Sequence, residues 1–260
     1  MYQKNYKSKT LRGKLRVCRM LSASPKVRRH VPETVAYNKR NLRRMVSKHS
    51  SLYVKLDVGS HGIGVFKITK AANGTYLLYS TQRRQQLCYA FHNLTDLSTH
   101  LKKVQPGKLI IQRAIPIDKV LGRPYDIRAM VQRKPGGSWK CTGLMGKIGM
   151  RNRIVTNHYQ GAELCTMDQL FSRQGLSKAK ASTRKKHLTK TALNISKALS
   201  KRKKGMHEMG VDLAYDTKQR LWVIEVNSNH PQFHPLRKLD PSAYQRMLRY
   251  ARSYGRKTSR

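Results

Sequence analysis

The chain has 260 residues and a formal net charge of +43, from 55 Lys and Arg against 12 Asp and Glu. This length suits one large domain or two lobes, and no apolar run approaches the roughly 18 residues of a membrane span, so we expect none. The charge predicts salt-sensitive attraction to polyanions, but nucleic acid, acidic polymers, anionic lipid and the phosphates of a small ligand all satisfy it.

The first thirty residues are basic, and their apolar residues are spaced for one face of a helix that ends near Pro25. No apolar stretch follows the basic start, so we see no secretory signal and expect a cytoplasmic protein. The four cysteines lack any C-x-x-C spacing, so we expect them to be reduced and buried rather than zinc ligands or disulfides. They are Cys18, Cys88, Cys141 and Cys165.

A glycine-rich hairpin comes next. Its first strand contains Lys55, and the loop that follows contains Gly59, Ser60, Gly62 and Gly64. Glycines let backbone N–H groups close on an anion, and the lysine adds a positive charge. Such a loop is also a common structural feature, so it is weak evidence alone. The pattern G-x-x-x-x-G-K-[ST] is absent, which excludes a Walker loop.

Apolar runs at residues 108–115, 125–132 and 139–146, separated by Gly and Pro turns, predict an antiparallel meander. A long basic helix is predicted over residues 178–208, which include the charge runs 184–186 and 201–204. Such runs are most often solvated helix faces. A polyanion-binding surface remains the alternative.

A hairpin of two apolar strands follows this helix and contains three polar residues of interest. If residues 217–220 form its loop, Asp212 falls opposite Glu225, and Asn227 lies on the same face as Glu225. Facing carboxylates repel each other unless a cation lies between them. Carboxylate and carbonyl oxygens are the ligands that Mg²⁺ prefers, so we expect a metal site. A half-buried strand with one stray acid is the alternative.

The same loop fixes the rest of the register. It pairs Asp216 with Leu221 and Ala214 with Val223. After the hairpin, a basic helix is predicted from Pro241 to Tyr254.

Taken together, these segments resemble the ATP-grasp superfamily, and within it the YheC/YheD family associated with bacterial endospore coats. The ribosomal-protein glutamate ligases are a more distant likeness. The resemblance covers nearly the whole chain, and the order and spacing of six motifs make it specific. The motifs are Val54-Lys55 with Gly59-Ser60-His61-Gly62-Ile63-Gly64, Ile111-Gln112-Arg113-Ala114-Ile115-Pro116, Gly122-Arg123-Pro124-Tyr125-Asp126-Ile127-Arg128, Val155-Thr156-Asn157, Gly210-Val211-Asp212 and Glu225-Val226-Asn227-Ser228.

The resemblance implies an α+β ATP-grasp fold, in which two lobes with antiparallel sheets enclose a nucleotide cleft. We expect an N-terminal helical segment at residues 1–35 and a first lobe with the glycine-rich loop at 36–112. A second lobe with the metal site follows at 113–235, and a basic C-terminal helix and tail at 236–260.

The resemblance also implies roles for individual residues. Expected ATP contacts are Lys9, Lys55, Gly59, Ser60, Gly62 and Gly64, the backbone of Gln112, Arg113, Ala114 and Ile115 at the adenine edge, and Asp126 at the ribose. Expected ligands of magnesium, as two ions, are Asp212, Glu225 and Asn227. Expected near the transferred phosphate are Lys147, Arg153 and Asn157, although ordinary surface charge is the alternative for Arg153.

The implied activity is an ATP-dependent ligase that joins a carboxylate to an amine or thiol through an acyl phosphate, with an unknown substrate. The chain departs from the family pattern at Leu56, where a proline is usual, and at residues 229–232, where a small residue and glycine are usual. Because the resemblance begins with the ATP-grasp lobes, we also expect the chain to lack the domain that often precedes them and helps to bind the acceptor. These departures support an alternative: a non-catalytic, spore-associated protein of this fold that adheres to anionic polymers or nucleic acid.

Overall fold

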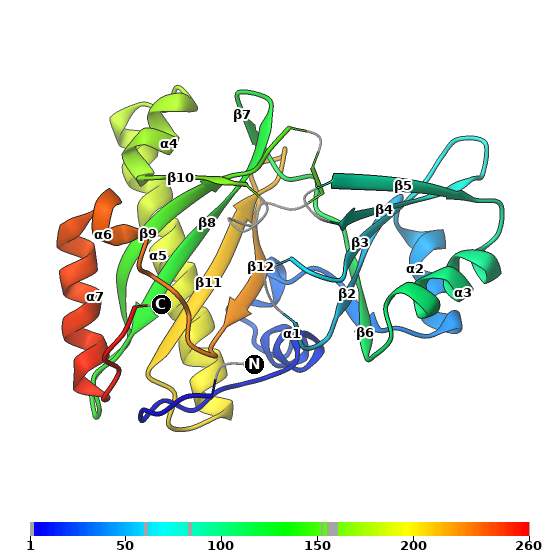
Figure 1. Cartoon of the computed structure of the whole chain (residues 1–260). Helices are drawn as coiled ribbons and strands as arrows, with labels where there is room; N and C mark the ends of the chain where they lie inside the picture. Colours follow the sequence, from blue (N-terminus) through cyan, green and yellow to red (C-terminus); the bar gives the residue numbers. More distant parts are fainter. Residues whose placement is uncertain (1–2, 60–61, 83–84, 152, 155–160, 260) are drawn as a thin grey trace.

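The computed structural model describes residues 3–59, 62–82, 85–151, 153–154 and 161–259, which form two lobes side by side (Figure 1). Each lobe has one antiparallel sheet with helices packed against it. The predicted α+β class with antiparallel sheets is therefore confirmed. None of the described helices is long and apolar enough to cross a membrane.

The smaller lobe contains a six-stranded sheet in the order β1-β6-β2-β3-β4-β5. Its core places Leu42, Met45, Leu97 and Leu101 of two helices against the apolar face of the sheet. Asn38 begins the first of these helices, because its side chain accepts a hydrogen bond from the backbone N–H of Asn41. The elements are β1 (Thr34–Ala36), α2 (Lys39–Lys48), β2 (Ser51–Leu56), β3 (Val65–Lys70), β4 (Tyr76–Gln82), β5 (Gln85–Phe91), α3 (Leu94–Val104) and β6 (Leu109–Arg113).

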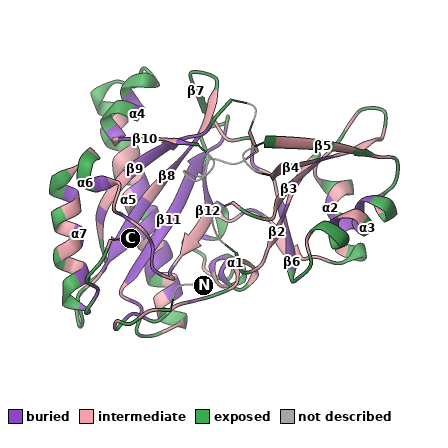
Figure 2. Cartoon of the chain, viewed as in Figure 1, coloured by how far each residue is buried: buried purple, intermediate pink, exposed green. Residues whose placement is uncertain are grey.

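The larger lobe contains a sheet in the order β10-β9-β8-β11-β12, and β7 pairs with β8. The buried residues of the chain are concentrated in these strands (Figure 2). The elements are α1 (Lys14–Ser22), the 3₁₀ helix η1 (Arg28–His30), β7 (Lys119–Val120), β8 (Arg123–Gln132), β9 (Lys140–Ile148), β10 (Glu163–Cys165), α4 (Met167–Arg173), α5 (Lys178–Arg202), β11 (Glu208–Tyr215), β12 (Leu221–Asn227), α6 (Leu236–Leu239) and α7 (Pro241–Ser253).

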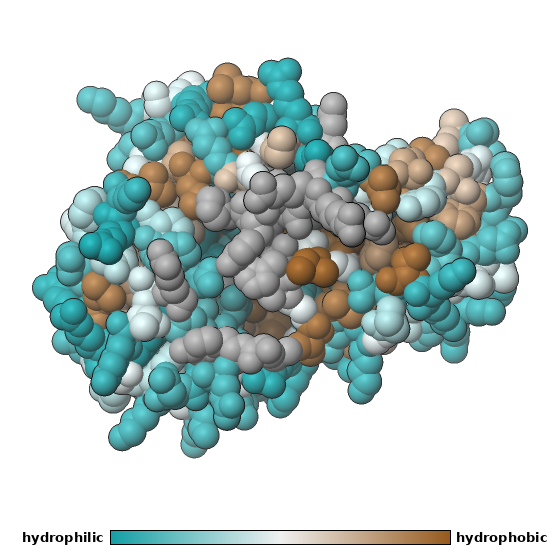
Figure 3. Space-filling model, in the orientation of Figure 1, coloured by the Kyte–Doolittle hydropathy of each residue, from teal (hydrophilic) through white to brown (hydrophobic). Residues whose placement is uncertain are grey.

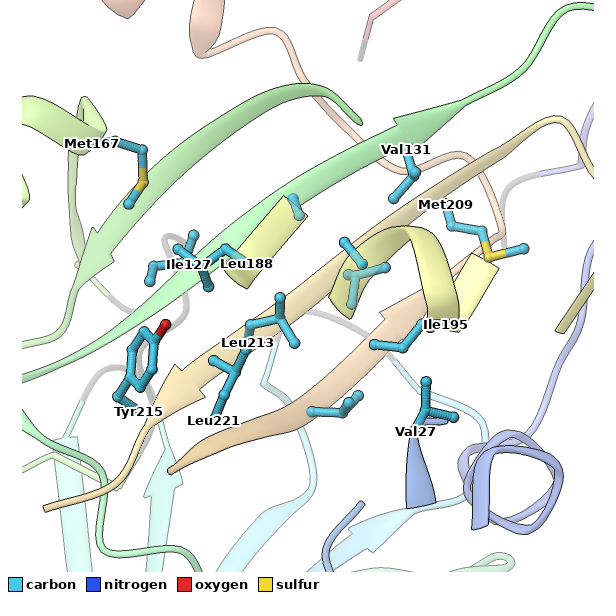
Figure 4. Close-up of a cluster of buried hydrophobic side chains, with 14 of the residues drawn as sticks. Val27, Ile127, Val131, Met167, Leu188, Ile195, Met209, Leu213, Tyr215 and Leu221 are labelled. Atoms are coloured by element: carbon cyan, nitrogen blue, oxygen red, sulfur yellow. The ribbon is translucent and has the colours of Figure 1, made fainter. Parts of the chain in front are cut away.

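Side-chain alternation along β8 divides the larger lobe into two layers. Ile127 and Val131 point to one face, where they join the core formed with α5, and Figure 4 shows Leu188 and Ile195 of α5 packed there. Met130 points to the other face, where it packs with α7. The polar residues of the cavity described below also project from this second face, because they alternate with the core residues.

Two expectations about strand pairing and one about the cysteines are wrong. Residues 108–146 do not form one meander, because β6 is inserted between β1 and β2 in the other sheet. The hairpin of β11 and β12 keeps the predicted pairing of Asp212 with Glu225. A bulge after Asp212 shifts the rest, so that Leu221 pairs with Tyr215 and Val223 with Leu213. All four cysteines are free, but Cys88 is exposed and only Cys165 is fully buried.

A buried polar cluster connects both ends of the described chain to the larger lobe. Glu208 and Arg256 are both fully buried and lie 2.6 Å apart. Lys4 lies 3.1 Å from the same carboxylate, and Tyr6 donates a hydrogen bond to it. Lys4 also donates to the carbonyl oxygen of Ser228, just beyond β12. The cluster therefore holds the segment that follows the predicted metal ligands.

Candidate functional site

A cavity of about 520 Å³ lies between the two lobes. It is within the range of roughly 300–1,000 Å³ that is usual for sites of small molecules and cofactors. Residues from α1, from the end of β2 with its loop, and from β8, β9, β11 and β12 line it. On this face of the molecule, hydrophobic residues gather where the lobes meet, whereas much of the surrounding surface is hydrophilic (Figure 3).

The three predicted metal ligands all line this cavity. Asp212 of β11 and Glu225 of β12 are direct cross-strand partners, and Asn227 lies two residues further along β12. The amide oxygen of Asn227 accepts a hydrogen bond from the backbone N–H of Asn229, which fixes the orientation of its side chain. The strands therefore bring two carboxylates and one carboxamide to one wall of the cavity.

Asp212 already has two positively charged neighbours. Arg128 donates to its two oxygens from Nε at 2.6 Å and from Nη2 at 2.9 Å, and the Lys147 ammonium lies 3.1 Å away. Burial alone would raise the pKa of Asp212, but these two positive charges lower it to about 2. Burial alone would lower the pKa of Lys147, but Asp126 and Asp212 raise it above its ordinary value. The carboxylate and the ammonium therefore both stay charged at neutral pH.

Glu225 faces the first turn of α1. The Lys14 ammonium lies 3.3 Å from the Glu225 carboxylate and also donates a 2.9 Å hydrogen bond to the carbonyl oxygen of Gly59, at the start of the glycine-rich loop. Asp57, which follows β2, accepts hydrogen bonds from the backbone N–H groups of Lys14 and Leu15. The N-terminus of α1 is thereby attached to the smaller lobe, and Lys14 bridges the two lobes.

Lys55 projects from β2 into the same cavity. Its ammonium donates to the side-chain oxygen of Gln112 at 2.8 Å and lies 5.2 Å from the centre of the Tyr53 ring. Burial lowers the pKa of Lys55 below its ordinary value, and the negative charge of Glu225 only partly offsets this. Lys55 and Lys14 thus supply two cationic groups opposite the carboxylates.

Several predicted residues lie elsewhere. The backbone N–H of Lys9 donates to the carbonyl oxygen of Gly205, and the residue does not line the cavity. Asp126 is buried behind the cavity wall as the partner of Lys147, at 2.6 Å, so it is not placed to meet a ribose in the cavity. Gly62 and Gly64 are not among the lining residues either, whereas Gly59 is.

The predicted adenine-binding strand is also arranged differently. Gln112 lines the cavity, but Arg113, Ala114 and Ile115 do not. The backbone N–H of Arg113 donates to the carbonyl oxygen of Glu33, and that of Ala114 donates to the carbonyl oxygen of Ser51. These two donors are therefore already used within the smaller lobe.

The loop after β9 reaches the smaller lobe. Tyr53 donates to the carbonyl oxygen of Ile154 at 2.7 Å, and the Ile154 N–H donates to the side chain of Gln86 at 3.1 Å. Arg153 is half-buried beside this contact and does not line the cavity. Ser60 and Asn157 lie outside the described residues.

The oxygen donors on the cavity wall fit a hard divalent cation. Two carboxylates and an amide oxygen match the ligand preference of Mg²⁺, which is commonly held by one or two carboxylates together with substrate phosphates. Among the described residues, no metal site is formed by three or more His, Cys, Asp and Glu side chains, and the set on the cavity wall has only two such residues together with Asn227. A zinc-like site is therefore not indicated there. The facing lysines fit phosphate oxygens.

The chain is similar to a known protein family and to two curated proteins. The family model described as YheC/D-like ATP-grasp matches residues 4–256. Endospore coat-associated protein YheD of Bacillus subtilis (strain 168) is 22% identical over 263 residues, which cover 96% of this chain and 56% of YheD. Endospore coat-associated protein YheC of the same organism is 22% identical over 200 residues, which cover 76% of this chain and 54% of YheC. The chain thus spans about half the length of these curated relatives.

A comparison with solved structures gives the same fold. N5-carboxyaminoimidazole ribonucleotide synthetase from Thermotoga maritima superposes with a TM-score of 0.51 over 96% of this chain and 51% of that protein. The sequence identity is 13%, so the likeness concerns the fold alone.

Proposed function

The chain belongs to the YheC/D-like ATP-grasp family, and on that premise we propose that it binds ATP with Mg²⁺ in the cavity and acts as a ligase. The reaction class is the joining of a carboxylate to an amine or thiol through an acyl phosphate. One observation carries the proposal: Asp212 and Glu225 face each other on the wall of the cavity that also receives Lys55 and Lys14. This combination provides anionic ligands for a cation and cationic ligands for phosphates.

In this proposal the acidic residues and Asn227 bind the metal ion, and the lysines bind the phosphates. Asp212, Glu225 and Asn227 hold Mg²⁺, which offsets the negative charge of the phosphates when bound. Lys55 and Lys14 bind phosphate oxygens, so Lys14 takes the role that the family resemblance implies for Lys9. Such cationic groups interact more strongly with phosphates in a partly enclosed cavity than on an open surface.

Arg128 and Lys147 keep a fixed positive charge beside Asp212. Because Arg128 holds the Asp212 carboxylate at both oxygens, it sets the orientation of that ligand. Lys147 is held in turn by Asp126. We therefore assign Arg128 and Asp126 to positioning, and Lys147 to stabilising negative charge at the transferred phosphate.

Isothermal titration with ATP, with and without Mg²⁺, tests the binding. We expect Mg²⁺-dependent binding that is lost in Glu225→Gln and kept in Glu163→Gln, a control whose carboxylate pairs with Arg123 and Arg173 outside the cavity. Absence of binding by the folded wild-type protein would reject the proposal. A screen of acidic metabolites and peptides for stimulated ADP release then tests the ligase reaction.

A non-catalytic protein of the same fold is the second candidate. The observation that favours it is the pairing of Asp212 with Arg128 and Lys147, because two positive charges already neutralise this ligand. Under this candidate the chain acts by adhesion, and we propose the endospore coat as its location because two of its relatives are named endospore coat-associated proteins. Mg²⁺-dependent ATP binding without ADP release across the substrate screen would favour it. Carboxylate-dependent ADP release that Glu225→Gln abolishes would exclude it.

A further inference from the structure

The exposed face of α5 carries a row of lysines. Lys186, Lys190, Lys197 and Lys201 are all exposed, and at 3.6 residues per turn they fall within an arc of about 60° and span about 22 Å of helix. We call these four residues the lysine ridge. The surrounding sequence is one-sided in charge: residues 169–207 contain 12 Lys and Arg and no Asp or Glu.

The charge of the ridge is not balanced locally. None of the ion pairs among the described residues includes a ridge lysine, whereas the neighbouring Lys185 is paired with Asp168 at 2.6 Å. The exposed Arg29 of η1 adds a further positive charge close to His187. Burial lowers the pKa of His187, and the charges of His30, Arg29 and Lys190 lower it further.

The ridge faces away from the cavity. The opposite side of α5 packs through Leu188 and Ile195 onto the sheet face that points away from Asp212 and Glu225 (Figure 4). The four lysines therefore have no part in ATP binding. They do not serve packing either, and like charges on one helix face repel each other.

From this arrangement we infer that the lysine ridge binds the backbone of double-stranded nucleic acid without reading its sequence. Lysines are point charges suited to phosphates and lack the planar fork that arginine uses to read guanine. The ridge has no exposed large apolar side chain to enter a membrane or to stack on bases. A duplex is stiff, so it can bind along the helix without losing much conformational entropy. A flexible acidic chain would lose conformational entropy on binding, which disfavours it as the partner.

Fluorescence anisotropy with labelled 20-base-pair duplexes tests this inference. The ridge variant carries Lys→Gln at all four ridge positions, and Gln is a good helix former. The matched control carries Lys→Gln at four exposed positions of the smaller lobe, Lys39, Lys70, Lys102 and Lys103. Both variants lose the same charge, so only the location differs.

We expect the ridge variant to bind at least tenfold more weakly near physiological salt and its salt slope to fall by about 3–4, because each phosphate contact contributes about 0.9. The control should weaken less than threefold, and two unrelated duplex sequences should bind alike. Equal weakening of ridge variant and control would overturn the inference, because total charge would then explain binding. Poly-glutamate or phosphatidylserine vesicles that displace the duplex at equal charge concentration would overturn it as well.

The inference does not depend on the proposed function. Titration with Mg²⁺ and ATP should give the same affinity for the ridge variant and the wild-type protein. If the wild-type protein does not bind ATP, the ligase proposal is rejected, but the inference about duplex binding still stands.

Discussion

Asp212 has both a structural and a ligand role, and a pair of substitutions separates them. We expect Asp212→Asn and Glu225→Gln both to abolish Mg²⁺-dependent ATP binding, but only Asp212→Asn to destabilise the fold. The reason is burial. Asp212 is 5% exposed and paired with Arg128 at 2.6 Å, whereas the side chain of Glu225 is 39% exposed and lies 3.3 Å from Lys14.

The loss of stability in Asp212→Asn can be estimated in two ways. The pKa of Asp212 falls from 3.8 to about 2, which corresponds to about 2 kcal/mol at roughly 1.4 kcal/mol per unit. Removing one partner of a buried ion pair typically costs about 3–5 kcal/mol. We therefore expect Asp212→Asn to lose about 3 kcal/mol, or roughly 6–12 °C in Tm at this chain length. Glu225→Gln should lose less than about 1 kcal/mol, as exposed pairs do.

Urea unfolding monitored by circular dichroism measures both losses. Because the pKa of Asp212 is lowered on folding, its stabilising contribution is fully present above pH 4 and is lost as the pH falls toward 2. The difference between wild type and Asp212→Asn should therefore shrink in that range. Adding Arg128→Met to Asp212→Asn should recover part of the loss, since no unpaired guanidinium then remains. Equal losses for Asp212→Asn and Glu225→Gln at neutral pH would refute the reasoning.

Three further predictions concern other described residues. Lys14→Gln should weaken Mg²⁺-ATP binding by about tenfold or more in calorimetry, whereas Lys9→Gln should leave it unchanged. The reverse result would support the role that the family resemblance implies for Lys9. Because burial lowers the pKa of Lys55, its positive charge is lost at a lower pH than in an exposed lysine. ATP affinity should thus begin to decrease, as the pH rises, below the ordinary pKa of a lysine, and Lys55→Met should flatten that profile. Glu208→Gln should lower the free energy of unfolding in urea by about 3–5 kcal/mol, because Arg256 is then buried without a carboxylate partner. A smaller loss would show that the other polar groups of the cluster stabilise the Arg256 charge without Glu208.

Local signals in the sequence predict most of the individual elements. Apolar periodicity locates α5, and the helix predicted from Pro241 to Tyr254 is α7. In the structure α2 begins at Asn38, a residue type that is common as a helix N-cap. The same type of signal identifies α3, which was overlooked, because Asn93 provides a capping side chain ahead of Leu97 and Leu101. Sheet membership is harder to predict from local patterns. The β6 strand is apolar in the same manner as β8, and only long-range packing places it in the other lobe.

In the candidate site, too, contacts within one hairpin can be predicted from the sequence, whereas contacts that depend on tertiary packing cannot. The hairpin spacing predicts that Asp212 faces Glu225, because one register determines both side chains. Lys14 was missed because its position depends on how α1 docks against the smaller lobe, and a basic N-terminal sequence offers several lysines with nothing to choose among them. Asp126 was given a ribose contact by resemblance, yet its buried ion pair with Lys147 depends on the neighbouring strand β9.

The attachment of α1 to Asp57 restricts how the two lobes can move. Val17 and Leu21 anchor this helix in the core of the larger lobe, while both hydrogen bonds from its first turn end on a single residue of the smaller lobe. The Lys14 side chain and Cys18 of the same helix also contact the smaller lobe, at the carbonyl oxygen of Gly59 and at the side chain of Gln112, so α1 holds the two lobes together beside the cavity. The hydrogen bonds of Ile154 with Tyr53 and Gln86 connect the two lobes at a second place. We expect any movement of one lobe against the other to turn about α1 and to require release of these Ile154 contacts.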